Sequence, residues 1–208
     1  MKNVYIIGAG GLGREIETWI EQDSSFNQNY EIKGYIDDNC NALESFPSKY
    51  KVLGNLSYPF KRDEYVILAI ANAEGKKNIV DDLKERVQFL SYISDKSLVS
   101  QDAVLGLGVV VCPHVIISTN TVINDFSLIN IGSQVGHDAE IGPYSSLMAG
   151  VDIGGGAKVG EGCFMGTHSC LIPRKKIGDN ITVGIGAVVI RNLKKVGTYF
   201  GNPAMLIS

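Results

Sequence analysis

Aliphatic residues recur at every sixth position through the second half of the chain. Counting from Leu105 to Val189, all fifteen successive positions in this register are apolar, and no polar residue interrupts the series. The following residue is glycine eight times, and the residue four positions on is usually small. Neither a helix, with a period of about 3.6 residues, nor a single alternating strand produces this spacing. A six-residue repeat is typical of a parallel β-helix.

The repeat predicts a triangular prism built from short strands and turns. Three hexads make one coil of eighteen residues, so fifteen hexads make about five coils. We expect the aliphatic side chains to point inward, the small ones to fit beside them, and glycine to relieve the backbone at the corners. Lys175 and Ile181 occupy columns where small residues are usual, and "PRKK" at 173–176 predicts a distorted turn or a positively charged edge.

The first part of the chain has a different pattern. "VYIIGAGGLGREIETWIEQD" predicts a strand, a glycine turn and an amphipathic helix. "EIKGYIDD", "EYVILAI" and "QFLSYI" predict further strands, with a second helix before the last of them. Alternating strands and helices favour a parallel sheet. We therefore expect a small α/β, Rossmann-like half domain over residues 1–93 and an all-β parallel β-helix domain over residues 94–208.

The glycine turn contains a GxGxxG motif formed by Gly8, Gly10 and Gly13. It follows a strand and opens a helix, which is the setting of a phosphate-binding fingerprint. Asp37 and Asp38 end the second strand, about where a ribose-binding acid is expected. The domain is too short for two mononucleotide-binding halves, so it is predicted to hold one nucleotide diphosphate, and redox chemistry with NAD is disfavoured. A turn that needs glycine for packing alone is the alternative.

Composition narrows the class of protein. The chain has 208 residues and a formal net charge of −3, which argues against a protein built to grip nucleic acid or an anionic membrane. No apolar run is long enough for a signal peptide or a membrane span. The four cysteines lack CxxC spacing and are expected to be free thiols. These features favour a cytoplasmic protein.

Three stretches together carry a resemblance to a known family. A short α/β domain that opens with "GAGGLGRE", hexapeptide repeats that contain "VGHDAEIG", and "FGNPA" near the end resemble acyltransferases of the sialic acid O-acetyltransferase type. Their relatives include nucleotide-amino-sugar N-acetyltransferases of bacterial surface-glycan synthesis. The resemblance implies a left-handed β-helix, a homotrimer with active sites between subunits, acetyl-CoA as the acyl donor and no metal.

The candidate catalytic pair is His137 and Asp138. His137 comes two residues after the inward Val135, so it should project from a corner of the prism. Imidazole titrates near neutrality and suits removal of a proton from an attacking amine, while a carboxylate can hold the other ring nitrogen. The family's general base occupies this position beside an acid. Gly155 lies one coil further on, and its N–H would steady the developing oxyanion.

The resemblance also implies contacts with both substrates. Coenzyme contacts are expected at Ser146, Gly155, Thr167 and Ile185, with "GNPA" at 201–204 closing over its far end and Arg174, Lys194 and Lys195 as candidates for its phosphates. A solvated basic face explains those three cations equally well. The nucleotide sugar is expected at Gly10, Gly11, Leu12, Asp37, Asp38 and Asn72.

Two positions depart from the family, because many members carry histidine where this chain has Leu12 and Ser146. These departures bear on the acceptor more than on the reaction. His114 and His168 share another corner, three coils apart, and are expected to be structural.

The sequence thus predicts transfer of an acetyl group to an amino group of a nucleotide-linked sugar. O-acetylation of a sugar hydroxyl or another small alcohol is the alternative reaction. A non-catalytic nucleotide-binding scaffold is the alternative from another class.

Overall fold

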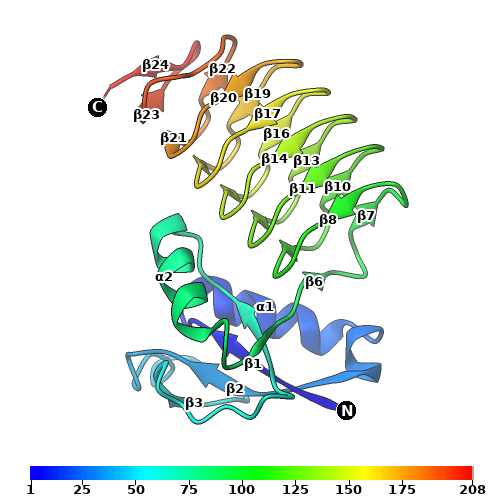
Figure 1. The fold of residues 1–208 in the computed structure, drawn as a ribbon, viewed down its shortest axis with the longest axis vertical. Helices are drawn as coiled ribbons and strands as arrows, with labels where there is room; N and C mark the ends of the chain where they lie inside the picture. Colours follow the sequence, from blue (N-terminus) through cyan, green and yellow to red (C-terminus); the bar gives the residue numbers. More distant parts are fainter. Residues whose placement is uncertain (208) are drawn as a thin grey trace.

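The computed structural model describes residues 1–207. Its N-terminal part is a five-stranded parallel sheet with helices (Figure 1). The strand order is β3-β2-β1-β4-β5. The chain winds from β1 to β2 in one direction and from β4 to β5 in the other, so the switch point lies between β1 and β4. The elements are β1 Lys2–Ile7, α1 Gly11–Gln22, the 3₁₀ helix η1 Phe26–Gln28, β2 Tyr30–Ile36, β3 Val52–Gly54, β4 Tyr65–Leu68, α2 Ala73–Leu83 and β5 Gln88–Phe89.

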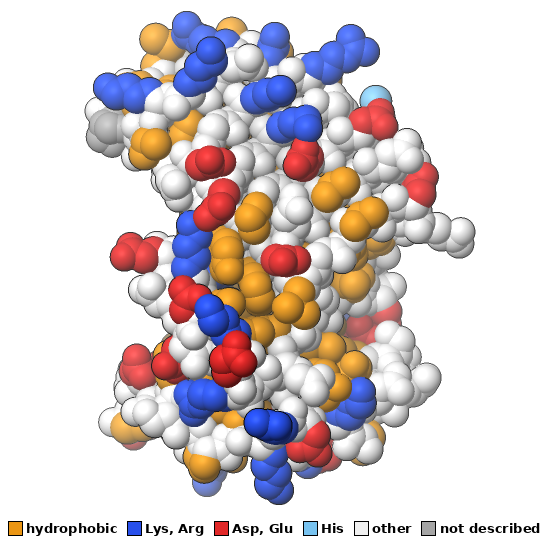
Figure 2. Space-filling model, viewed as in Figure 1, with side chains coloured by type: hydrophobic (Ala, Val, Ile, Leu, Met, Phe, Trp, Pro, Cys, Tyr) orange, Lys and Arg blue, Asp and Glu red, His pale blue; other side chains and the backbone are white. Residues whose placement is uncertain are grey.

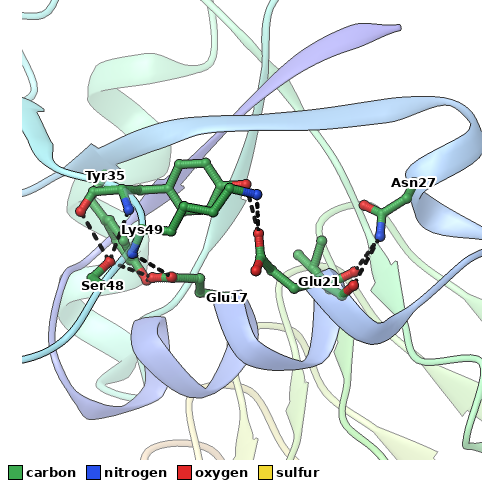
Figure 3. A network of polar contacts seen from close by, with 8 residues as sticks. Glu17, Glu21, Asn27, Tyr35, Ser48 and Lys49 are labelled. Atoms are coloured by element: carbon green, nitrogen blue, oxygen red, sulfur yellow. Dashed lines mark hydrogen bonds and ion pairs between the residues drawn. The ribbon is translucent and has the colours of Figure 1, made fainter.

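Helix α1 packs on this sheet through Ile16 and Ile20, which are fully buried. The same helix holds the long connection that follows β2 (Figure 3). The buried Glu17 accepts hydrogen bonds from Tyr35 and from Ser48 Oγ, the latter at 2.8 Å. This carboxylate therefore fixes the connection before the short strand β3, which the sequence pattern did not predict.

The segment "QFLSYI" forms two strands, so the prediction of one strand there was wrong. β5 pairs with β4 in the α/β sheet, whereas β6 (Tyr92–Ile93) pairs with β9 in the second half of the chain. Phe89 is buried in one sheet and Tyr92 in the other. The chain passes from one domain to the other across Leu90 and Ser91.

The second half is a parallel β-helix whose strands are mostly two residues long and spaced by six (Figure 1). Strands β6 to β20 make five complete coils, and β21 and β22 begin a sixth, which agrees with the predicted repeat. The strands are β7 Leu98–Val99, β8 Val104–Leu105, β9 Val110–Val111, β10 Ile116–Ile117, β11 Val122–Ile123, β12 Leu128–Ile129, β13 Gln134–Val135, β14 Glu140–Ile141, β15 Ser146–Leu147, β16 Asp152–Ile153, β17 Lys158–Val159, β18 Phe164–Met165, β19 Cys170–Leu171, β20 Lys176–Ile177, β21 Ile181–Val183 and β22 Val188–Val189, followed by β23 Gly197–Phe200 and β24 Met205–Leu206.

The prism has three faces, each a sheet of parallel strands, and one of these sheets is extended by β23 and by β24, which runs antiparallel to β23. Face 1 contains β6, β9, β12, β15, β18 and β21, face 2 contains β7, β10, β13, β16, β19 and β22, and face 3 contains β8, β11, β14, β17 and β20. The turns between the faces form three vertices: vertex 1–2 includes the turn between β9 and β10, vertex 2–3 the turn between β10 and β11, and vertex 3–1 the turn between β11 and β12, with the equivalent turns of every other coil. Inside, the aliphatic column is buried from Val111 to Val189 as predicted, and only its first member, Leu105, is half-buried.

Side chains of the small column do more than fit beside the aliphatic ones. Ser127, Ser133 and Ser145 donate their hydroxyls to backbone carbonyls of the next coil, at 3.0, 2.9 and 2.7 Å. These hydrogen bonds satisfy polar atoms that the closed prism buries.

In every turn from β8 to β22, left-handed backbone occurs at one fixed place, the third residue after the aliphatic one. Glycine fills some of these positions, and non-glycine residues such as Asn120 and Asp138 fill others, with φ of 54° and 59°. The predicted role of the glycine directly after the aliphatic residue was therefore wrong, since its φ is not left-handed. That glycine is needed because coils approach closely: a Cβ on Gly136 would lie 2.7 Å from the amide nitrogen of Gly155.

The "PRKK" turn at 173–176 has the same left-handed position as the others, with φ 61° at Arg174. The positively charged edge is the expectation that holds. Figure 2 shows Lys and Arg side chains gathered at this end of the β-helix, above the last coils. Ile181 is fully buried and lengthens β21 to three residues.

The α/β domain covers face 1 and vertex 3–1. Val110 and Leu128 point outward from face 1, yet each is only 2% exposed. Helix α2 lies against vertex 3–1, where Lys77 forms a 2.5 Å ion pair with Glu161. One continuous apolar cluster joins the two domains. No helix among residues 1–207 combines the length and apolar character that crossing a bilayer requires.

Candidate active site

His137 projects from vertex 2–3, in the turn between β13 and β14. Its side chain is 64% exposed, so the imidazole is outside the prism as the sequence predicts. Nδ1 lies 2.7 Å from Oδ2 of Asp138. A carboxylate at Nδ1 favours a proton on that nitrogen, which leaves Nε2 as the basic atom.

Asp138 occupies the left-handed position of this turn, and that conformation directs its carboxylate to the preceding ring. Asn120, one coil below, donates a 3.3 Å hydrogen bond to its other oxygen. The hydrogen bond from His137, and then that from Asn120, holds the pKa of the Asp138 carboxyl below its usual value. The pair therefore keeps its negative partner ionised near neutral pH.

Gly155 lies directly beside the His137 ring, one coil further along the same vertex. A Cβ on Gly155 would stand 2.5 Å from Nε2 of His137. The amide of Gly156 donates to the carbonyl of His137 at 2.7 Å, which fixes the two turns relative to each other. Within residues 1–207 the Gly155 amide donates to no acceptor, so its N–H is available to a ligand.

The other predicted coenzyme residues lie elsewhere. Thr167 and Ile185 are both on vertex 1–2, so a single chain does not bring them to His137. Ser146 is on face 1 and fully buried. Its hydroxyl accepts from Lys76 Nζ at 2.9 Å and donates to the carbonyl of Ala71 at 2.7 Å. The predicted coenzyme contact at Ser146 does not match this geometry, because the hydroxyl is fully engaged within the chain.

The glycines in the glycine turn of the α/β domain differ in why the structure needs or allows glycine there. Gly8 has φ +99°, and a Cβ on Gly13 would collide with the carbonyl oxygen of Gly8. Around Gly10 and Gly11, by contrast, nothing lies within 4 Å of the Cβ position. Packing thus explains part of the motif, and open space at the start of α1 remains for a ligand. Leu12, on the first turn of α1, is half-buried against the core.

Asp37 ties the glycine turn to β2. Its Oδ2 accepts from the amide of Ala9 at 2.7 Å, and its Oδ1 accepts from the amide of Asn39 at 2.9 Å. Asp38 is exposed beside it, and both line a cavity of about 200 Å³ with Gly8 and Ile70. Asn72 caps α2 by accepting from Gly75 N at 2.7 Å. The predicted nucleotide residues therefore gather at the switch point of the sheet.

The remaining candidates are arranged by the repeat. His114 and His168 share vertex 1–2, as predicted, and both are exposed. Arg174 is on vertex 2–3, two coils above Asp138, while Lys194 and Lys195 follow β22 at the end of the prism. The GNPA segment lies between β23 and β24 at the same end. Residues 1–207 hold no cluster of three or more His, Cys, Asp or Glu side chains that could bind a metal ion.

Sequence reasoning missed Lys76. This lysine is on α2, is 1% exposed and contacts the β-helix through its ammonium group. The signal was present, because Lys76 shares the helical face of the buried Val80 and Leu83. A lysine on the apolar face of a helix must find buried acceptors.

Comparison with known proteins agrees with this architecture. Residues 3–83 match the PglD N-terminal domain. The chain is 29% identical over 194 residues to GDP-perosamine N-acetyltransferase of Escherichia coli O157:H7, covering 90% of this chain and 78% of that protein. Both matches agree with the resemblance to hexapeptide-repeat acyltransferases that the sequence motifs carry.

Solved structures of similar fold cover the whole chain. The acetyltransferase domain of PglB from Neisseria gonorrhoeae FA1090 superposes with a TM-score of 0.90 at 23% identity, covering 100% of both chains. PerB from Caulobacter crescentus, in complex with CoA and GDP-perosamine, superposes with a TM-score of 0.75 at 24% identity, covering 100% of this chain and 98% of that one. The β-helix is therefore left-handed, as the resemblance implied.

Proposed function

We propose that this protein transfers the acetyl group of acetyl-CoA to an amino group of a nucleotide-linked amino sugar, in the cytoplasm, for surface-glycan synthesis. The observation that carries the proposal is the exposed His137–Asp138 pair beside Gly155, whose amide has no acceptor among residues 1–207. The similarity to GDP-perosamine N-acetyltransferase supports the acceptor class. The open glycine turn at the switch point supports a nucleotide in the α/β domain.

The chemistry follows from the atoms at vertex 2–3. Nε2 of His137 takes a proton from the acceptor amine as its nitrogen attacks the thioester carbonyl carbon. Asp138 stabilises the imidazolium that forms. The Gly155 amide donates to the developing oxyanion. The carbon–sulfur bond then breaks, and the thiolate of CoA recovers the proton from His137, so no covalent enzyme intermediate is needed.

The proposed site is complete only between copies of the chain. His137 and Gly155 are on vertex 2–3, Thr167 and Ile185 are on vertex 1–2, and the α/β domain of the same chain covers vertex 3–1. A coenzyme bound in a cleft between neighbouring prisms would contact vertex 2–3 of one chain and vertex 1–2 of the next. This separation supports the homotrimer that the family resemblance implied.

Mass spectrometry of the reaction product tests the proposal. The purified protein is incubated with acetyl-CoA and amino sugars linked to GDP or UDP, and the product is examined before and after mild alkaline treatment. We expect a gain of one acetyl group that survives alkali, because amides persist where esters hydrolyse. An alkali-labile product would indicate O-acetylation, and no CoA binding in calorimetry would indicate a scaffold.

Replacement of the base tests the mechanism. His137→Ala should lower kcat by about 10²–10⁴-fold, the usual scale for a general base. Because the side chain is exposed, the melting temperature and oligomeric state should stay at the wild-type values. Wild-type turnover by this variant would remove His137 from the mechanism.

A further inference from the structure

A lysine that the proposed reaction does not use is buried where the two domains meet. Lys76 projects from α2 into vertex 3–1 and is 1% exposed. Its ammonium donates to the carbonyls of Phe126 and Ser145, at 2.9 and 3.2 Å, and to Ser146 Oγ at 2.9 Å. No carboxylate within residues 1–207 forms an ion pair with it.

These contacts set the direction of a hydrogen-bond chain. In its ammonium form Lys76 has three N–H donors and no acceptor, so Ser146 accepts from it. The Ser146 hydroxyl is then committed as a donor to the carbonyl of Ala71, at 2.7 Å. The chain of bonds runs from α2 through β15 of the β-helix and back to the loop between β4 and α2.

The loop that receives the last bond belongs to the proposed acceptor site. Ala71 directly precedes Asn72, which caps α2, and Ile70 lines the cavity shared by Gly8, Asp37 and Asp38. On the other side, Ser146 in β15 follows His137 by nine residues along the β-helix, with only β14 between them. The bond to Ala71 therefore connects the acceptor loop to the framework that carries the base.

We propose that Lys76 and Ser146 are positioning residues that hold the loop 70–73 in register with the β-helix, so that a nucleotide-linked acceptor is presented at the correct height to the acetyl donor. The inference rests on the proposed function. A buried polar chain suits this role because its geometry is sharply defined, and loss of one member leaves the others unsatisfied. Neither residue touches the reacting atoms.

The test compares Ser146→Ala and Lys76→Met with a control on the same helix, Lys77→Gln. Ser146→Ala removes only the bond to Ala71 and one acceptor of Lys76, whereas Lys77→Gln breaks the half-exposed ion pair with Glu161. Hydrogen exchange of the amides of residues 71–75 is measured without ligand. Dissociation constants are measured by calorimetry for acetyl-CoA and for whichever of GDP and UDP the wild-type protein binds.

We expect both network variants to speed exchange at residues 71–75 by about tenfold and to weaken nucleotide binding by about fivefold. Binding of acetyl-CoA should stay within twofold, and Lys77→Gln should resemble the wild type in all three measurements. The double variant should be no worse than Lys76→Met, since members of one network are not additive.

Wild-type exchange and wild-type nucleotide affinity in Ser146→Ala would overturn the inference. So would an equal weakening of both ligands in all three variants, because that pattern indicates general loosening of the domain contact. If Lys76→Met does not fold, Ser146→Ala alone decides. If the wild-type protein binds neither GDP nor UDP, the proposed function has failed, and exchange in Ser146→Ala still decides whether the network holds the loop.

Discussion

At the scale of single residues, the candidate base is placed by the backbone of its neighbours. Asp138 has left-handed backbone, with φ 59°, and this turns its carboxylate onto the His137 ring. Gly155 leaves room for the same ring because it has no Cβ. A base that reacts at one nitrogen needs both its tautomer and its orientation fixed. Here Asp138 fixes the tautomer of His137, and Gly155 leaves space for its ring.

Gly155→Ala tests whether that room matters. The new methyl group would meet Nε2 of His137 at 2.5 Å, so the imidazole must move. The backbone itself tolerates alanine, because Ala149 holds the same turn position on vertex 1–2. Displacement of a catalytic group by about 1 Å costs on the order of 10²-fold in rate, and we expect that loss in kcat.

The melting temperature of Gly155→Ala should remain near the wild-type value. Combining it with His137→Ala provides the control. If the methyl group acts only through the ring, the double variant is no slower than His137→Ala. A further tenfold loss in the double variant would show that Gly155 acts on the substrates independently of His137.

Lys76 makes stability depend on pH. Burial lowers the pKa of its ammonium to about 7 in the folded protein, from an ordinary value near 10.5. Between these values the unfolded chain binds more protons than the folded one, so the free energy of unfolding rises with pH. Below about pH 7 both states are charged, and the cost of the buried ammonium is constant.

Lys76→Met removes this titration. We therefore expect the stability of wild type relative to Lys76→Met to improve from pH 7 to pH 9.5, measured by urea unfolding at one protein concentration. Every other titratable side chain is the same in the two proteins, so the change in this difference with pH reports on Lys76. A difference that is flat across the range would mean that the folded protein holds Lys76 with an ordinary pKa.

At the scale of elements, the hexad register predicts the strands because it reports directly on what points into the prism. Each two-residue strand ends on a residue of the apolar column, as the spacing indicates. The reason for glycine was not predictable from one hexad, since the crowding comes from the coil above. β5 and β6 were merged for a similar reason, because an apolar run does not reveal which sheet each residue joins.

Gly142→Ala tests the crowding between coils. Its φ is not left-handed, but a Cβ there would lie 2.7 Å from the amide nitrogen of Glu161 in the next coil. Overpacking of this kind costs about 1–3 kcal/mol, and we expect the free energy of unfolding to fall by that amount. Denaturation at matched protein concentration measures the loss.

Ser118→Ala is the matched control, because Ser118 holds the same place in its hexad and already has a Cβ. It should change stability by less than about 0.5 kcal/mol. Equal effects in the two variants would contradict the explanation from close approach and would return the glycine column to a role in backbone conformation.

At the scale of the whole molecule, sequence reasoning grouped residues within the β-helix but did not predict how the α/β domain covers it. The hexad numbering puts His137 and Gly155 on one vertex, and it puts Thr167 and Ile185 on another. Lys76 escaped attention because only the contact between domains shows that its helical face is covered by the β-helix. The α/β domain covers vertex 3–1 of its own chain, so in the proposed trimer vertices 1–2 and 2–3 would face the neighbouring copies.

Mixing two inactive variants tests whether each site is shared between copies. His137→Ala removes the base, whereas Gly10→Trp fills the open space at the start of α1 and should exclude the nucleotide. If a base and an acceptor loop of different chains form each site, co-expressed hybrids contain some sites in which both are intact. We expect such hybrids to recover at least a tenth of wild-type turnover per chain.

When both parts of a site come from one chain, every chain in the hybrid carries one defect. Turnover as low as in the separate variants, from hybrids verified by mass spectrometry, would place the whole reaction within a single subunit.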